Sequence, residues 1–186
     1  MGNPYEKCPV YENETYLLRF VEAGDAPDLL RVYSDEKAVP FFNSDNCNGD
    51  DFHYTTLERM ERAIGFWQWE YEKRRYVRWT IIDKSTMQAI GTMELFNRQA
   101  KDYFNNCGLL RLDVRSDYEK TERIAAILSL IVPRALELFD CRMLATKVPP
   151  FASERKKAVE QLGFAATEEK LVGGHDGQAY GDYYVL

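Results

Sequence analysis

The sequence predicts a mixed α/β fold, with one sheet covered by helices on both faces and the element order β-α-α-β-β-β-α-β-α-β-β. Three observations support this prediction. Two helix-like segments follow the first strand, three strands then follow one another across short turns, and a helix, strand and helix precede a closing pair of strands. A Rossmann fold would alternate strands and helices throughout, and a sandwich would contain few helices, so neither matches this order.

The first residues differ in character from the rest of the chain. Residues 1–14 are polar, contain Pro4 and Pro9, and show no periodic pattern. We therefore expect a loosely held N-terminal arm over 1–14 and one domain over 15–186, a length typical of single domains.

A strand and two helices are expected next. Residues 16–22 alternate as a strand does. Asp25 can cap the free N–H groups of a following helix, and Pro27 suits its first turn. The polar stretch 43–51 predicts a surface loop. In 55–71 a Thr-x-x-Glu capping box precedes apolar residues at helical spacing.

The middle of the chain predicts three strands and a long helix. Residues 76–83, 89–96 and 107–115 are strand candidates, and the short turns between them indicate an antiparallel meander. The helix expected over 119–139 contains Pro133, which should kink or break it because proline has no N–H to donate.

The last quarter predicts a strand, a helix and a hairpin. A strand over 143–148 stops before two prolines, and a helix over 153–161 ends at Gly163, a residue typical of helix C-termini. Residues 164–172 and 178–186 then predict two strands paired across a glycine-rich turn.

Composition excludes several classes of partner. The net charge of −6 disfavours binding to nucleic acid or to an anionic membrane surface. The basic cluster 73–78 is interpreted as the solvated end of a helix running into a strand. Residues 1–186 contain no run of 18 apolar residues and no apolar N-terminal signal, so we expect a cytoplasmic protein without a membrane span. The cysteines are widely spaced, which predicts no metal site.

Five segments, taken in order, resemble the GNAT superfamily of N-acyltransferases, and most of all its branch of ribosomal-protein N-terminal acetyltransferases. They are 16–26 with its L-R-x-(hydrophobic)-x-x-x-D-A pattern, 34–39, the hairpin 79–95 with its Ile90-Gly91, Gln161-Leu162-Gly163-Phe164, and 177–184. The resemblance runs from about residue 15 to the end. It implies a GNAT-like fold and transfer of an acetyl group from acetyl-CoA to a primary amine, either of a small molecule or of a peptide or protein N-terminus.

The resemblance also implies where acetyl-CoA would lie. In the family the cofactor occupies the point where two central strands separate, with its pantetheine arm along the first strand and its pyrophosphate at the N-terminus of the next helix. Free N–H groups and the helix dipole favour an anion there. The implied backbone contacts are Leu112, Asp113 and Val114 for the pantetheine arm, and Glu119, Lys120, Thr121, Glu122, Arg123 and Ile124 for the phosphates.

The phosphate turn departs from the family pattern R/Q-x-x-G-x-G/A. Lys120 and Glu122 stand at the two glycine positions, where glycine lets the backbone approach the phosphate. Lys120, Thr121 and Arg123 could compensate through charge or hydroxyl contacts. Glu119 and Glu122 would repel phosphate, or serve as first-turn helix charges. Two interpretations stay open, a working transferase and a fold that has lost its cofactor.

Direct acyl transfer needs a base for the amine proton and an acid for the leaving thiolate. Glu94 and Asp113 are the candidate bases, although either could be an ordinary strand carboxylate. Tyr183 is a candidate acid, with Tyr180 and Tyr184 also available. Ser153 is either a cofactor contact or a helix cap.

A Cys-His nucleophile pair is the remaining catalytic alternative. It would combine Cys107 or Cys141 with His53 or His175. A further alternative to the enzyme is a non-catalytic module of the same fold that binds a ligand or partner. Loops 43–51 and 97–106 are expected to shape the acceptor site, because loops carry variable function. A homodimer is possible, but the sequence assigns no surface to it.

Overall fold

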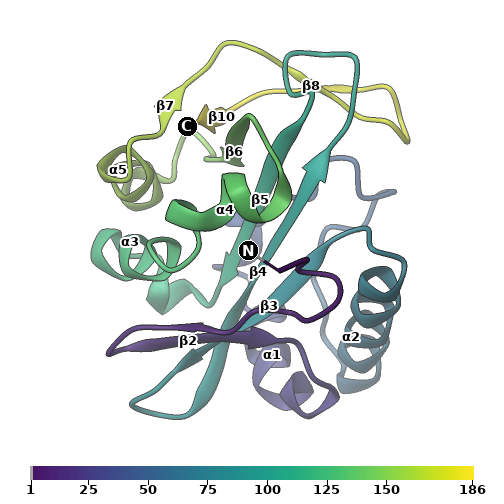
Figure 1. Cartoon of the computed structure of the whole chain (residues 1–186). Coiled ribbons are helices and arrows are strands. Elements are labelled where there is room, and N and C mark those ends of the chain that lie inside the picture. Colours follow the sequence, from purple (N-terminus) through teal and green to yellow (C-terminus); the bar gives the residue numbers. More distant parts are fainter. Residues whose placement is uncertain (1) are drawn as a thin grey trace.

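The computed structural model describes residues 2–186. Within them, eight strands form one mixed sheet in the order β1-β2-β3-β4-β5-β6-β10-β7, and β8 and β9 form a separate pair (Figure 1). The strands are β1 Tyr11–Glu12, β2 Tyr16–Phe20, β3 Val77–Asp83, β4 Gln88–Arg98, β5 Cys107–Val114, β6 Met143–Lys147, β7 Ala165–Ala166, β8 Leu171–Val172, β9 Ala179–Tyr180 and β10 Tyr183–Val185. Among these strands, β5 and β6 form the one parallel pair.

Helices cover both faces of the sheet, as predicted. They are α1 Ala26–Tyr33, α2 Leu57–Glu72, α3 Thr121–Leu128, α4 Val132–Phe139 and α5 Ser153–Gln161, with short 3-10 turns η1 Ala23–Asp25, η2 Val39–Phe41 and η3 Ser116–Tyr118. Strand β3 shows how the faces divide, because successive side chains of a strand point to opposite sides. Trp79 and Ile81 pack in the core beneath α3, α4 and α5, whereas Ile82 packs with α1 and α2. The predicted mixed α/β class is confirmed.

Pro133 breaks the long helix expected over 119–139. The segment forms α3 and α4, and Pro133 lies in the first turn of α4, where its missing N–H leaves no hydrogen bond unmade. The helix predicted over 153–161 is confirmed as α5.

Three local predictions need correction. The helix cap expected at Thr55 is Thr56, whose hydroxyl accepts from the Arg59 N–H at 3.2 Å. Asp25 makes no side-chain cap to α1. Its carboxylate instead binds the Arg19 guanidinium at 2.6 Å, an ion pair that links β2 to the start of α1. The closing hairpin is divided, since β8 pairs with β9 while β7 pairs with β10.

The N-terminal segment is held against the sheet. Trp79 Nε1 donates to the Pro9 carbonyl at 2.8 Å, and Tyr71 Oη donates to the Pro4 carbonyl at 2.9 Å. Strand β1 also pairs with β2. The expected loose attachment is therefore wrong for residues 2–14, while the domain boundary at residue 15 stays a prediction. The prolines that suggested an irregular arm still carry carbonyls, and these carbonyls accept the anchoring bonds.

Strands β5 and β6 separate halfway along β5 and near the end of β6. Their parallel pairing runs from Cys107 and Met143 to Leu110 and Thr146. Beyond this point β5 continues to Val114 without a partner in β6, while the other edge of β6 pairs with β10 from Ala145 to Lys147. The opening between the two strand ends is called the groove below. It is the place where the family resemblance locates the pantetheine arm.

Candidate functional site

The groove is filled by a side chain of this protein. Arg155, from α5, is 3% exposed and donates from Nη1 to the carbonyl of Leu112 at 3.0 Å. The same nitrogen donates to the carbonyl of Phe41 at 3.1 Å. The carbonyl of Leu112, which was expected to face the pantetheine arm, is therefore already bonded to a guanidinium.

Arg155 is neutralised by Glu119. The two side chains are 3% and 6% exposed and form a buried ion pair, in which Nε lies 3.2 Å from Oε2 and a second bond joins Nη2 to Oε1. Removing both charges from water costs free energy, and only close contact with well-aligned hydrogen bonds offsets this cost. Glu119 thus directs its carboxylate toward Arg155, and its backbone N–H donates to the carbonyl of Ser116 at 3.2 Å.

The predicted phosphate turn is occupied as well. At the start of α3 the Thr121 N–H donates to Glu154 Oε2 at 2.9 Å, and the Thr121 hydroxyl donates to the same oxygen at 2.5 Å. The first N–H groups of a helix have no partner within it, so an acceptor from elsewhere satisfies them. Here a carboxylate of α5 stands where a phosphate was expected.

The remaining turn residues do not gather around a phosphate position. Arg123 donates to the carbonyl of Asp117 at 3.1 Å and lies over the Tyr118 ring. Lys120 and Glu122 are exposed, and Ile124 is buried in the core. Ser153 is exposed at the first position of α5, where Ala152 is the capping residue, so Ser153 is not the helix cap.

In this arrangement the groove does not fit CoA. The resemblance assigned the carbonyl of Leu112 to a pantetheine arm and the N–H of Thr121 to a pyrophosphate, but Arg155 and Glu154 already bond these two groups. The carboxylates of Glu119 and Glu154 would also repel phosphate charge. We therefore derive no catalytic step that involves CoA.

The opposite face of the sheet carries a row of charged side chains. Arg78 of β3, Glu94 of β4 and Arg111 of β5 are cross-strand neighbours. Glu94 is ion-paired to Arg78, and its other oxygen accepts from Arg111 Nη1 at 2.9 Å. Trp67 of α2 covers the row, with the Arg78 guanidinium 4.2 Å from the ring centroid.

Asp113 lies in the neighbouring row. Its Oδ2 accepts from the hydroxyl of Tyr33 at 2.7 Å and from Arg78 Nη1 at 3.3 Å. Strand β4 contributes Thr92 beside it, opposite Asp113 in the pairing register. The structure thus brings Glu94 and Asp113, the two candidate bases, to the same arginine.

The two carboxyls differ in acidity. Burial raises the pKa of Asp113, and the attraction of Arg78 offsets only part of this effect. Burial also disfavours the charged form of Glu94, but Arg78 and Arg111 together outweigh it and lower the pKa of Glu94. A base works best when its pKa approaches the working pH, so by acidity alone Asp113 suits the role better.

Tyr183, the candidate acid, lies near the groove on this same side. Its hydroxyl donates to Asp45 Oδ2 at 3.0 Å, and Asp45 also binds Lys147 Nζ at 2.7 Å. Burial and the charge of Asp45 raise the pKa of Tyr183. The phenol is therefore a weaker acid than an exposed tyrosine.

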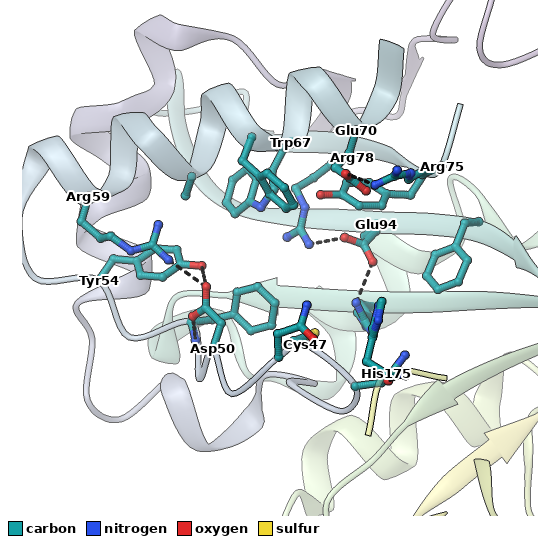
Figure 2. A pocket seen from close by; sticks show the side chains of 18 residues that line it. Cys47, Asp50, Tyr54, Arg59, Trp67, Glu70, Arg75, Arg78, Glu94 and His175 are labelled. Atoms are coloured by element: carbon teal, nitrogen blue, oxygen red, sulfur yellow. Dashed lines mark hydrogen bonds and ion pairs between the residues drawn. The ribbon is translucent and has the colours of Figure 1, made fainter. Parts of the chain in front are cut away.

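A cavity of about 520 Å³ opens beside the charged row (Figure 2). Its aromatic wall comes from Phe52, Tyr54, Trp67 and Phe96, and its charged floor comes from Arg78, Glu94 and Arg111. Figure 2 shows Arg59, Asp50 and Tyr54 bonded together at one end and Arg75 paired with Glu70 at the other. Of the predicted catalytic residues Glu94, Asp113 and Tyr183, Glu94 lines this cavity.

The loop expected to shape the acceptor site borders the cavity. Asn46, Cys47, Asn48 and Asp50 line it, and His175 closes it from the β8–β9 turn. The loop 97–106 lines a second cavity of about 490 Å³, into which Arg111 also extends. The sequence does not reveal that Arg78 and Arg111 belong to the site, because Arg78 is part of the basic cluster 73–78 interpreted as solvated, and Arg111 is a single cation in an apolar strand without a motif.

The Cys-His alternative gains no support from the thiols. Burial raises the pKa of Cys107 to about 12 and that of Cys141 to about 11. Both are thus protonated at neutral pH, whereas the thiolate is the nucleophile. In the described residues, 2–186, no group of three or more His, Cys, Asp or Glu side chains could hold a metal ion.

No helix in the described part of the chain has the length and apolar character needed to cross a membrane.

The fold, however, has close counterparts. A Vibrio cholerae protein assigned as a ribosomal-protein-serine acetyltransferase is similar with a TM-score of 0.71 at 12% identity, over 100% of this chain and 99% of that one. The ribosomal-protein-S5-alanine acetyltransferase of Vibrio fischeri is similar with a TM-score of 0.69 at 15% identity, over 95% of this chain and 94% of that one. Mycobacterium smegmatis RimJ, in complex with CoA-disulfide, is similar with a TM-score of 0.67 at 16% identity, over 91% of this chain and 79% of that one.

These likenesses confirm the fold that the resemblance implied. The chain has the fold of the GNAT acetyltransferases, along its whole length. No family model matches its sequence. Comparison with curated proteins finds no match either. At identities this low the fold is shared, while the residues of the site have to be judged on their own geometry.

Proposed function

We propose that this protein is an N-acyltransferase that transfers an acetyl group from acetyl-CoA to a primary amine. The acceptor would be a small molecule or a peptide or protein N-terminus. Support comes from the fold shared with acetyltransferases, and above all from the cavity of about 520 Å³ beside the groove. Arg111, one residue beyond the last β5–β6 pair, reaches into this cavity, so an acceptor bound there would lie next to the strand opening.

Glu94 is the residue we place at the acceptor. Its carboxylate lies on the cavity floor between two guanidinium groups. It can hold the acceptor amine through hydrogen bonds, and it can take the amine proton if the acceptor displaces one arginine. Asp113 and Tyr183 lie behind the cavity wall, and we assign them the role of holding Arg78 and the segment around Asp45.

The donor test is direct binding of acetyl-CoA. A ligand that binds the native state alone at 100 times its Kd stabilises it by about 2.7 kcal/mol, which a thermal melt detects. We expect such a stabilisation at millimolar acetyl-CoA, and release of free CoA thiol when an accepted amine is added. Glu94→Gln should lower the rate of thiol release by about a hundredfold. Glu160→Gln, which changes an exposed side chain of α5, is the control. Absence of any thermal stabilisation would contradict the proposal.

A second candidate is a ligand-binding module that uses no CoA. The observation in its favour is the occupied groove, where Arg155 holds the carbonyl of Leu112 and Glu154 holds the N–H of Thr121. This candidate predicts that a ligand occupies the cavity while acetyl-CoA gives no stabilisation. A cytoplasmic location and a homodimer stay predictions from the sequence.

A further inference from the structure

The contacts that fill the groove all come from two consecutive residues of α5. Glu154 reaches the N-terminus of α3 through Thr121, and Arg155 reaches β5 through Leu112 and the following turn through Glu119. Helices α3 and α5 lie side by side in consequence (Figure 1). One turn of one helix thus closes the opening between two strands.

Each of these contacts lies where the family resemblance places a contact of CoA. The Glu154 carboxylate takes the place of a phosphate at the helix N-terminus, where an anion is favoured. Arg155 takes the place of an amide N–H donor at the carbonyl of Leu112. The protein and CoA therefore compete for the same donor and the same acceptor.

The two closing contacts differ in strength. Arg155 and Glu119 are both buried, and separating a buried ion pair strands a charge away from water. Glu154 is partly exposed, so water can replace its contact with Thr121. The Glu154 contact is the easier one to open, and it covers the position of the phosphates.

We propose that Glu154 and Arg155 form a latch that excludes CoA from the groove until the first turn of α5 moves away. This inference rests on the proposed function, since it concerns the donor site of the same enzyme. It assigns Glu154 to the control of CoA affinity and Arg155 to the closure of the strand opening. Neither residue needs to touch the reacting atoms.

The latch is tested by titrating CoA itself into four proteins in a calorimeter. They are the wild type, Glu154→Ala, the triple variant Glu154→Ala/Arg155→Met/Glu119→Gln, and the control Glu160→Ala. The triple variant removes the buried pair together, so no unpaired charge remains. Glu160 is an exposed carboxylate on the same helix, so Glu160→Ala changes net charge equally without opening the groove. Thermal melts establish that each variant is folded.

We expect Glu154→Ala to lower the Kd of CoA about tenfold relative to the wild type, because it frees a donor and removes a repelling charge. The triple variant should lower it further, and Glu160→Ala should leave it within about twofold. Equal affinity of the wild type and both opened variants would overturn the latch and leave the donor assignment intact. If CoA binds to none of them, the latch and the acetyl-CoA donor are both overturned, and the ligand-binding module is favoured.

Discussion

Two buried arginines, Arg78 and Arg155, lie on opposite faces of the same sheet and have opposite consequences. Arg78 is 2% exposed and Arg155 is 3% exposed, and each is neutralised by a buried glutamate. Arg78, however, lies in the floor of a cavity, whereas Arg155 fills the opening in which it lies. A buried charge can thus either border a binding space or remove one.

The difference follows from the elements that carry the two side chains. Arg78 extends from β3 in a row with Glu94, and side chains of α2 and of the loop before it line the cavity beside this row. Arg155 extends from a helix end toward the carbonyl of Phe41 in η2 and toward that of Leu112, which lies beyond the last β5–β6 pair. Backbone carbonyls need a donor when they are buried, and here a side chain supplies it.

The largest test of this comparison is Arg78→Met. The substitution leaves Glu94 and Asp113 buried with one cation fewer, so we expect a loss of about 3–5 kcal/mol in the free energy of unfolding. Urea denaturation at pH 7 measures it. Arg62→Met, which breaks an ion pair with Glu58 in which both side chains are exposed, is the control and should cost much less. A loss below about 1 kcal/mol would mean that the charged row does not depend on Arg78.

A smaller loss is expected from Arg155→Met, because a single carboxylate is left unpaired. We expect about 3 kcal/mol, of which Glu119→Gln in the same chain should restore at least half, since the stranded charge is then removed as well. Urea denaturation of the wild type, both single variants and the double variant gives the coupling between the two residues. A double variant no more stable than Arg155→Met would show that Arg155 acts through Leu112 and Phe41 alone.

The smallest effect is the pH dependence of Glu94. Its pKa is lowered in the folded protein, so its contribution to stability is present above the unfolded pKa of about 4.3 and is lost as the pH falls through the folded pKa. The difference in unfolding free energy between the wild type and Glu94→Gln should therefore narrow below about pH 4. Urea denaturation at pH 7 and pH 3.5 checks this. A difference that widens on acidification would contradict the lowered pKa.

Much of the fold could be predicted from the sequence, because periodicity and turn residues act locally. The meander β3–β4–β5, the helix at 153–161 and the break at Pro133 each follow from neighbouring residues. The anchoring of 2–14 could not be predicted in this way, since its partners Trp79 and Tyr71 lie about 70 residues along the chain. The cap at Thr56 instead of Thr55 is an error of one residue at an element boundary.

The site was less predictable than the fold. The missing glycines at Lys120 and Glu122 marked the turn as a departure from the family pattern, without indicating which side chain would bond its backbone. What fills the groove comes from another part of the chain, since Arg155 lies 36 residues after Glu119 and no motif in the helix 153–161 marks it as the cation that points inward. Arg78 was grouped with the solvated cluster 73–78, although the strand alternation buries it while Lys73 and Arg74 stay exposed.

One connecting segment touches both regions, because Phe41 accepts a hydrogen bond from Arg155 and Asn46 to Asp50 line the cavity. If this segment has two positions, a ligand that prefers one of them at the cavity changes the affinity of the groove. Thermodynamic reciprocity then requires a ligand in the groove to change the affinity of the cavity by the same factor. The two ligands would then influence each other through the segment, without any contact between them.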